Sequence, residues 1–94
     1  SKAMEQKIIR NLQNTNDTLQ RILIMGNLAS GESFNYLKKI VEDKHVSMQL
    51  KEEAVLTMEA NIDSEVGSYL NSLLSNKDKI IIEAAKKTLA AQTK

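Results

Sequence analysis

The sequence predicts an all-α fold, and three observations support this class. Aliphatic residues recur at helical spacing in six segments that are joined by short polar connections. Proline is absent and glycine occurs three times, whereas a fold with many tight β-turns normally needs more of both. Aromatic residues make up only 3% of the chain, so aliphatic side chains must fill the core, which suits packed helices. With 94 residues, we expect one compact domain over residues 1–94.

The first three predicted helices cover about residues 3–13, 18–29 and 31–42. A polar break at 14–16 ends the first. Asp17 and Gln20 have the spacing of a capping box for the second, and Ser30 is the predicted N-cap of the third. The apolar stripes are Ile8, Ile9 and Leu12; Leu19, Ile22, Leu23, Met25 and Leu28; and Phe34, Leu37, Ile40 and Val41.

The last three predicted helices cover about residues 46–61, 64–74 and 79–91. Asp63 or Ser64 can cap the fifth helix, and Asp78 can cap the sixth. The apolar stripes are Leu50, Ala54, Val55, Met58 and Ile62; Val66, Tyr69, Leu70, Leu73 and Leu74; and Ile81, Ala84, Ala85, Thr88 and Leu89. Because the connections are short, we expect sequential helices to pack antiparallel as neighbours.

Internal repetition is the strongest single signal in the sequence. The Tyr-Leu pair at 36–37 recurs at 69–70, an offset of 33 positions. The same offset pairs Ile40 with Leu73, Val41 with Leu74, Lys44 with Lys77, Met25 with Met58 and Ile22 with Val55. An offset of 31 relates Ala54, Thr57 and Met58 to Ala85, Thr88 and Leu89. A two-helix unit with a period in the thirties is typical of an α-solenoid.

Residues 23–37, which read LIMGNLASGESFNYL, resemble the core of a HEAT repeat of the lyase-like subtype. Met25-Gly26-Asn27-Leu28 fits the end of the first helix of such a repeat, and the aliphatic pairs 40–41 and 73–74 fit the second. The resemblance covers about residues 18–91. It implies a short α-solenoid of about three antiparallel helical hairpins in a right-handed superhelical stack, and such stacks usually bind proteins as scaffolds without chemistry of their own.

The chain also departs from the HEAT pattern. The usual arginine and proline of the first helix are missing, and Arg21 stands where a small core residue is expected. Glu59-Ala60 replaces the glycine of the second unit. These departures leave an armadillo-like geometry open. Residues 1–4 are compatible with an expression scar ahead of a fragment, so the natural protein could be longer.

Composition excludes several functions and predicts a compartment. The net charge of +1 gives no general attraction to nucleic acid or to anionic membranes. Without cysteine there is no disulfide framework, thiolate metal site or cysteine nucleophile. No stretch approaches the roughly 18 apolar residues of a membrane helix, and the start lacks the apolar region of a signal peptide. We therefore expect a cytoplasmic protein with no membrane association.

Catalytic and cofactor chemistry finds little support in the sequence. His45 lies in a polar turn, and the chain has no second histidine or cysteine to share a metal with it. The acidic residues Glu52, Glu53 and Glu59 fall on a face that the helical period places in solvent. Gly26 and Gly31 form no phosphate-binding motif and are interpreted as close-packing and turn glycines. We expect no enzyme activity, no metal and no cofactor; an enzyme is conceivable only as a small subunit of a larger complex.

Tyr36 and Tyr69 are the most suggestive pair, because they occupy equivalent positions in successive repeats. Stacking should bring them near one another at the edge of the apolar stripe, where tyrosine suits either a core edge or a protein interface. The candidate partner surface is Tyr36, Lys38, Lys39, Glu42, Tyr69, Asn71 and Ser72. The expected partner is another protein; the alternative is nucleic acid, bound through lysine-rich faces that include Lys38, Lys39 and the segment 77–94.

Overall fold

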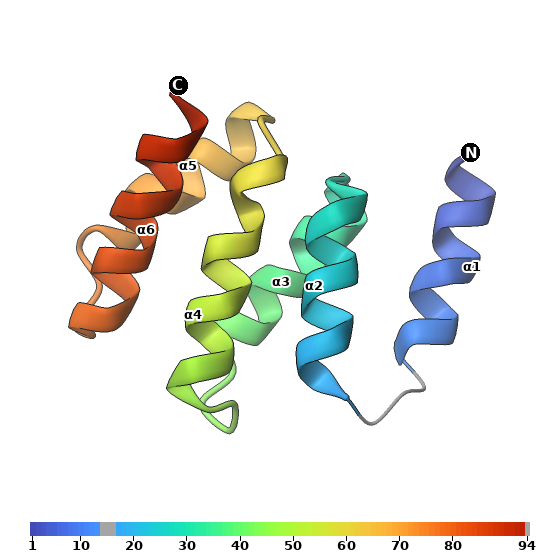
Figure 1. Ribbon diagram of the computed structural model, residues 1–94, viewed down its shortest axis with the longest axis horizontal. Coiled ribbons are helices and arrows are strands. Elements are labelled where there is room, and N and C mark those ends of the chain that lie inside the picture. The colour runs from blue at the N-terminus through green and yellow to red at the C-terminus, as the bar shows by residue number, and fades with distance from the viewer. Residues whose placement is uncertain (14–16, 94) are drawn as a thin grey trace.

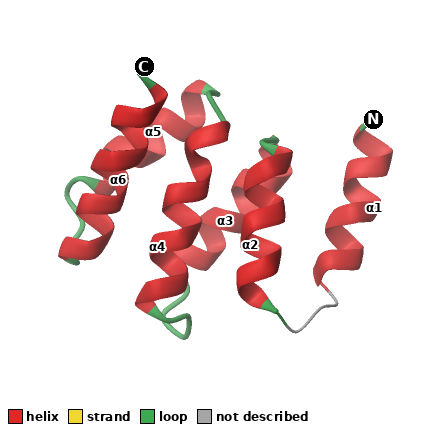
Figure 2. Ribbon diagram, viewed as in Figure 1, coloured by secondary structure: helices red, strands yellow, loops and turns green. Residues whose placement is uncertain are grey.

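The computed structural model describes residues 1–13 and 17–93 of the chain, without the side chains of residues 8–13. This described part is helical and contains no strand (Figure 2). The helices are α1 (Lys2–Gln13), α2 (Thr18–Leu28), α3 (Gly31–Glu42), α4 (Met48–Leu56), the 3-10 helix η1 (Thr57–Ala60), α5 (Ser64–Leu73) and α6 (Lys79–Gln92). The predicted all-α class is confirmed, while the polar break predicted at 14–16 lies outside the described residues.

The helices form two layers. Helices α2, α4 and α6 lie side by side and run in the same direction, while α3 and α5 lie behind them (Figure 1). Helix α1 lies beside α2 at one edge of the molecule. The Cα atoms fill 34 × 29 × 16 Å, and the 16 Å dimension matches two layers of helices packed about 8–10 Å apart.

Asp17 and Ser30 cap the starts of α2 and α3 as predicted, although the capping box predicted at α2 is found at α3. The Asp17 carboxylate accepts a hydrogen bond of 3.0 Å from the backbone N–H of Gln20. At the start of α3, Ser30 and Ser33 form a reciprocal capping box, in which each hydroxyl accepts from the other residue's backbone N–H. Both arrangements satisfy backbone donors that have no partner within the helix.

The later caps are confirmed only in part. Of the two candidates for α5, Asp63 is the N-cap, and it accepts from the N–H of Glu65 at 2.9 Å. Ser47 caps α4, a role that the sequence analysis did not assign. Asp78 stands at the N-cap of α6, but within the described residues its side chain makes no capping hydrogen bond.

The helix predicted over residues 46–61 is wrong in its extent. The α-helix begins at Met48 and ends at Leu56, and the chain then tightens into η1. Three carbonyls at and just beyond this tightened end accept from the side-chain amide of Gln92, at 2.8–3.3 Å; they belong to Met58, Glu59 and Asn61. Carbonyls at the end of a helical stretch have no partner within the helix, and here a distant residue supplies one.

Ile62 does not join the apolar stripe of this helix, contrary to the prediction. Its side chain is 84% exposed, whereas its neighbour Asn61 is only 8% exposed. Helical periodicity no longer applies there, because the backbone is extended from Asn61 onward. The polar residue therefore turns inward, where its side chain finds hydrogen-bond partners.

Buried aliphatic side chains from α2 to α6 form one core, with Phe34 as its only fully buried aromatic residue among those described. The core consists of Ile22, Met25, Phe34, Leu37, Val41, Ala54, Val55, Met58, Val66, Leu70, Leu73, Ile81, Ala84 and Ala85. Leu19, Leu23 and Leu74 were predicted in the same stripes but are each more than a third exposed. Leu19 and Leu23 belong to α2 but not to its buried residues, and Leu74 is the C-cap residue beyond α5.

Gly26 allows α2 to approach the junction of α4 and η1. A Cβ atom at position 26 would lie 2.7 Å from both Cβ and Cγ2 of Thr57, and closer still to its hydroxyl oxygen. By contrast, a Cβ atom at Gly31 or Gly67 would meet nothing within 4 Å. The predicted close-packing role is therefore specific to Gly26.

Candidate binding face on α3 and α5

The predicted partner surface falls on the two helices of the rear layer. Tyr36, Lys38, Lys39 and Glu42 belong to α3, and Tyr69, Asn71 and Ser72 belong to α5. The side chains of Lys39, Glu42, Asn71 and Ser72 are exposed, while Tyr36, Lys38 and Tyr69 are half-buried. We call these seven residues the α3/α5 face.

Tyr69 is the centre of the contacts on this face. Its hydroxyl donates a hydrogen bond of 3.0 Å to Oε2 of Glu42, and the ammonium of Lys38 lies 5.4 Å from the centroid of its ring. The ring also meets Phe34 edge-on, with centroids 5.6 Å apart and an interplanar angle of 73°. Three side chains of α3 therefore converge on one side chain of α5.

The electrostatics of this cluster keep the Tyr69 hydroxyl protonated. Burial raises the pKa of Tyr69 well above its usual range, because the phenolate would lose hydration. The hydrogen bond to Glu42 and the negative charge of that carboxylate raise the pKa further. The Lys38 ammonium lies against the ring as a cation–π contact, which contributes about 0.5–1 kcal/mol at an exposed site.

Among the described residues the ring contact of Tyr69 is with Phe34, while the nearness of Tyr36 and Tyr69 stays a prediction. Phe34, two residues before Tyr36, is the aromatic residue that meets Tyr69. Tyr36 is half-buried and packs against the core. Phe34 belongs to the apolar stripe of its helix, but nothing in the local sequence indicates that its ring contacts α5.

The two polar candidates of α5 bond within their own helix. The Asn71 side-chain amide donates to the carbonyl of Gly67 at 2.9 Å, and the Ser72 hydroxyl donates to the carbonyl of Tyr69 at 2.6 Å. Both side chains are exposed, and these hydrogen bonds stay within α5.

His45, weighed in the sequence as a metal ligand, lies between α3 and α4. His45 is exposed in its turn, where its backbone N–H donates to Asp43 at 2.9 Å. Within residues 1–13 and 17–93, no three histidine, cysteine, aspartate or glutamate side chains are close enough to hold a metal ion.

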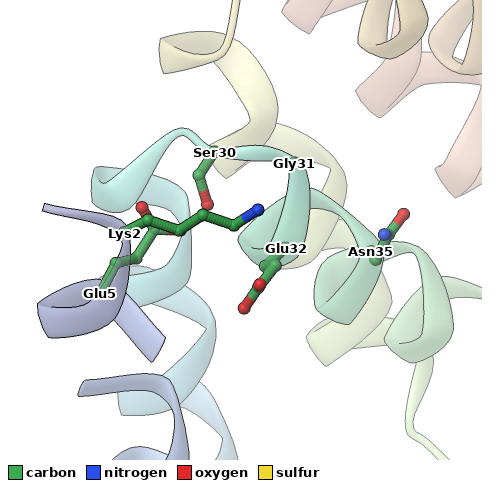
Figure 3. Close-up of a pocket in the computed structure, with 6 residues that line it drawn as sticks. All are labelled: Lys2, Glu5, Ser30, Gly31, Glu32 and Asn35. Carbon is green, nitrogen blue, oxygen red and sulfur yellow. The ribbon is translucent and has the colours of Figure 1, made fainter. Parts of the chain in front are cut away.

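A shallow pocket of about 370 Å³ lies between α1 and the start of α3, and the sequence analysis did not identify it. Figure 3 shows the Lys2 side chain extending between the two helices, with Glu5 and Glu32 beside it. Ser30, Gly31 and Asn35 complete the lining. Gln6 spans the same gap, since its amide donates to Glu32 at 2.7 Å. One ammonium and two carboxylates give this pocket a mixed charge.

No protein-family model matches the chain, and neither does any curated protein or solved structure. The resemblance to HEAT repeats therefore stays a prediction. Across the described part of the chain, none of the helices has both the length and the apolar content needed to cross a membrane.

Proposed function

We propose that this chain is a non-catalytic protein-interaction module, built as a short HEAT-like α-solenoid of about three antiparallel hairpins, and that the α3/α5 face binds its protein partner. The layered order from α2 to α6 supports the architecture: α2, α4 and α6 lie side by side, and α3 and α5 form a second layer (Figure 1). In solenoids of this kind the second helices of successive repeats build one continuous binding surface.

The contact of Lys38, Glu42 and Phe34 with Tyr69 is the observation that carries the proposal. These contacts fix a tyrosine, a lysine and a carboxylate in one arrangement before any partner arrives. Side chains that are already ordered lose less conformational entropy on binding. Tyrosine is also among the residues that contribute most to interface energies.

Nucleic acid is the weaker candidate for the same face. Lys38 lies over the Tyr69 ring, and the hydroxyl of the same tyrosine binds the Glu42 carboxylate, whose negative charge would oppose a phosphate. On α5 the corresponding residues are Asn71 and Ser72, so positive charge does not continue from one helix to the next. A protein partner with its own polar and aromatic groups fits this mixed surface better.

Site-specific photo-cross-linking in cells tests the proposal. A photoreactive amino acid would replace Lys39 or Asn71 on the α3/α5 face, and Gln49 or Lys86 on the front layer as matched controls, since all four side chains are exposed. We expect one protein to be cross-linked from the first two positions and not from the controls.

Two outcomes would contradict the proposal. One is cross-linking to a protein from the front-layer positions only. The other is a mobility shift with duplex or single-stranded nucleic acid at low salt that Lys39→Glu abolishes, because it would assign the face to the alternative ligand.

A further inference from the structure

Three chain segments at one end of the molecule are joined in series by side-chain amides. The amide of Asn61 donates to the carbonyl of Ser30 at 3.2 Å, and the amide of Gln92 donates to the carbonyl of Asn61 at 2.8 Å. Each link spans 31 residues of sequence. We call this series the amide ladder.

The ladder connects the starts of the two helices that form the proposed binding face. Ser30 is the N-cap of α3, and Asn61 lies two residues before Asp63, the N-cap of α5. The Asn61 carbonyl oxygen of the side chain also accepts from the N–H of Asp63 at 3.2 Å. A single buried side chain thus bonds both helix starts, and its burial makes an unpaired amide costly.

The second link between α3 and α5 is made by Tyr69, whose contacts on α3 extend from the first turn to the last residue. The hydroxyl of Tyr69 donates to Glu42, the last residue of α3, and the rings of Tyr69 and Phe34 meet. Together with the shared core, the two links hold α3 and α5 in one relative position. Removing Asn61 should leave α3 and α5 held by Tyr69 and by the core that both helices share.

We infer that Asn61 is a positioning residue of the α3/α5 face: its hydrogen bond to Ser30 sets the spacing of α3 and α5 and so the geometry that a partner meets. The part of this inference that concerns partner binding rests on the proposed function. The spacing itself is a property of the free protein and can be measured without a partner.

Dipolar electron paramagnetic resonance between two spin labels tests the spacing. The chain contains no cysteine, so Asn35→Cys on α3 and Ser68→Cys on α5 give two unique, exposed labelling sites. Thr88→Val is the matched control, because the buried Thr88 hydroxyl also donates to a carbonyl on another helix, that of Val55 at 3.3 Å, but joins α6 to α4. All variants are measured at temperatures where they are equally folded.

We expect Asn61→Ala to shift and broaden the distance distribution relative to the parent, and Thr88→Val to leave it unchanged. Asn61→Asp should broaden it at neutral pH, where a carboxylate faces the Ser30 carbonyl. It should restore the parent distribution near or below about pH 4, where the protonated acid can donate. This rescue would distinguish positioning from a general loss of packing.

The inference is overturned if Asn61→Ala keeps the parent distribution, or if Thr88→Val broadens it as much. Either result would leave the proposed function untouched, since that is decided by cross-linking from the α3/α5 face. Conversely, a failure of the cross-linking experiment would leave the measured spacing intact.

Discussion

Replacing Gly26 by alanine should destabilise the fold, although alanine is the better helix former. Gly26 lies inside α2, where glycine costs about 0.5–1 kcal/mol relative to alanine. The added Cβ, however, would lie 2.7 Å from two carbon atoms of Thr57 and closer still to its hydroxyl. Thr57 is short and β-branched, so it cannot swing aside as a long flexible side chain would.

The expected loss of stability is the difference between the cost of overpacking and the gain in helix propensity. Overpacking in a well-packed region costs about 1–3 kcal/mol, and the rigid neighbour places this site at the upper end. After the gain in helix propensity, the net loss is about 1–2 kcal/mol. For a domain of this size each kcal/mol corresponds to a fall of roughly 4–8 °C in melting temperature.

Chemical and thermal unfolding followed by circular dichroism measure the effect, with Gly67→Ala as the matched control. Gly67 also lies inside a helix, but a Cβ there meets nothing within 4 Å, so alanine should stabilise the protein by about 0.5–1 kcal/mol. In a Thr57→Gly background, Gly26→Ala should reverse sign and become stabilising. If Gly26→Ala in the parent protein is neutral or stabilising, the close approach of α2 to Thr57 is refuted.

Three further predictions concern burial, capping and pH. Leu70→Asp should unfold the domain, because Leu70 is fully buried. Ile62→Asp should change the free energy of unfolding by less than about 0.5 kcal/mol, because Ile62 is exposed. Urea denaturation compares the two variants, and equal losses of stability would refute the assigned burial. Ser30→Ala should cost about 1 kcal/mol through loss of the cap on α3, and unchanged stability in the same assay would argue against the capping box. The raised pKa of Tyr69 means that its contribution to stability is complete below about pH 10, the unfolded value, and is lost as pH rises through the higher folded value. Tyr69→Phe should therefore weaken the alkaline decline of the melting temperature, and NMR of the Tyr69 ring should show that its pKa falls in Glu42→Gln; an unchanged pKa would contradict the hydrogen bond.

Local signals in the sequence were sufficient for most helices and for part of the core. The positions of Asp17 and Ser30 before periodic apolar segments predicted where α2 and α3 begin, because a cap acts within one helical turn. The inward stripe of α6 was also predicted, since Ile81, Ala84 and Thr88 follow the helical period and are buried.

Features that depend on distant partners were not predicted. Asn61 is hydrogen-bonded to Gln92 and to Ser30, each 31 residues away, so local patterns could not indicate its burial. Equal spacing in the sequence predicted that Tyr36 and Tyr69 lie near one another, but it gave no sign that the Phe34 ring meets Tyr69. The seven candidate residues were assigned to one face by their helix positions, while the cluster around Tyr69 emerges only when α3 and α5 are placed together.

The central claim is that α3 and α5 form one face, and an NMR nuclear Overhauser experiment on the free protein tests it most directly. The chain has only three aromatic residues, so the aromatic protons of Phe34 and Tyr69 can be assigned with little overlap. With ring centroids 5.6 Å apart, we expect cross-peaks between the two rings. Cross-peaks from Tyr69 to Tyr36 in place of Phe34, or none to either ring in a folded sample, would contradict the face described above.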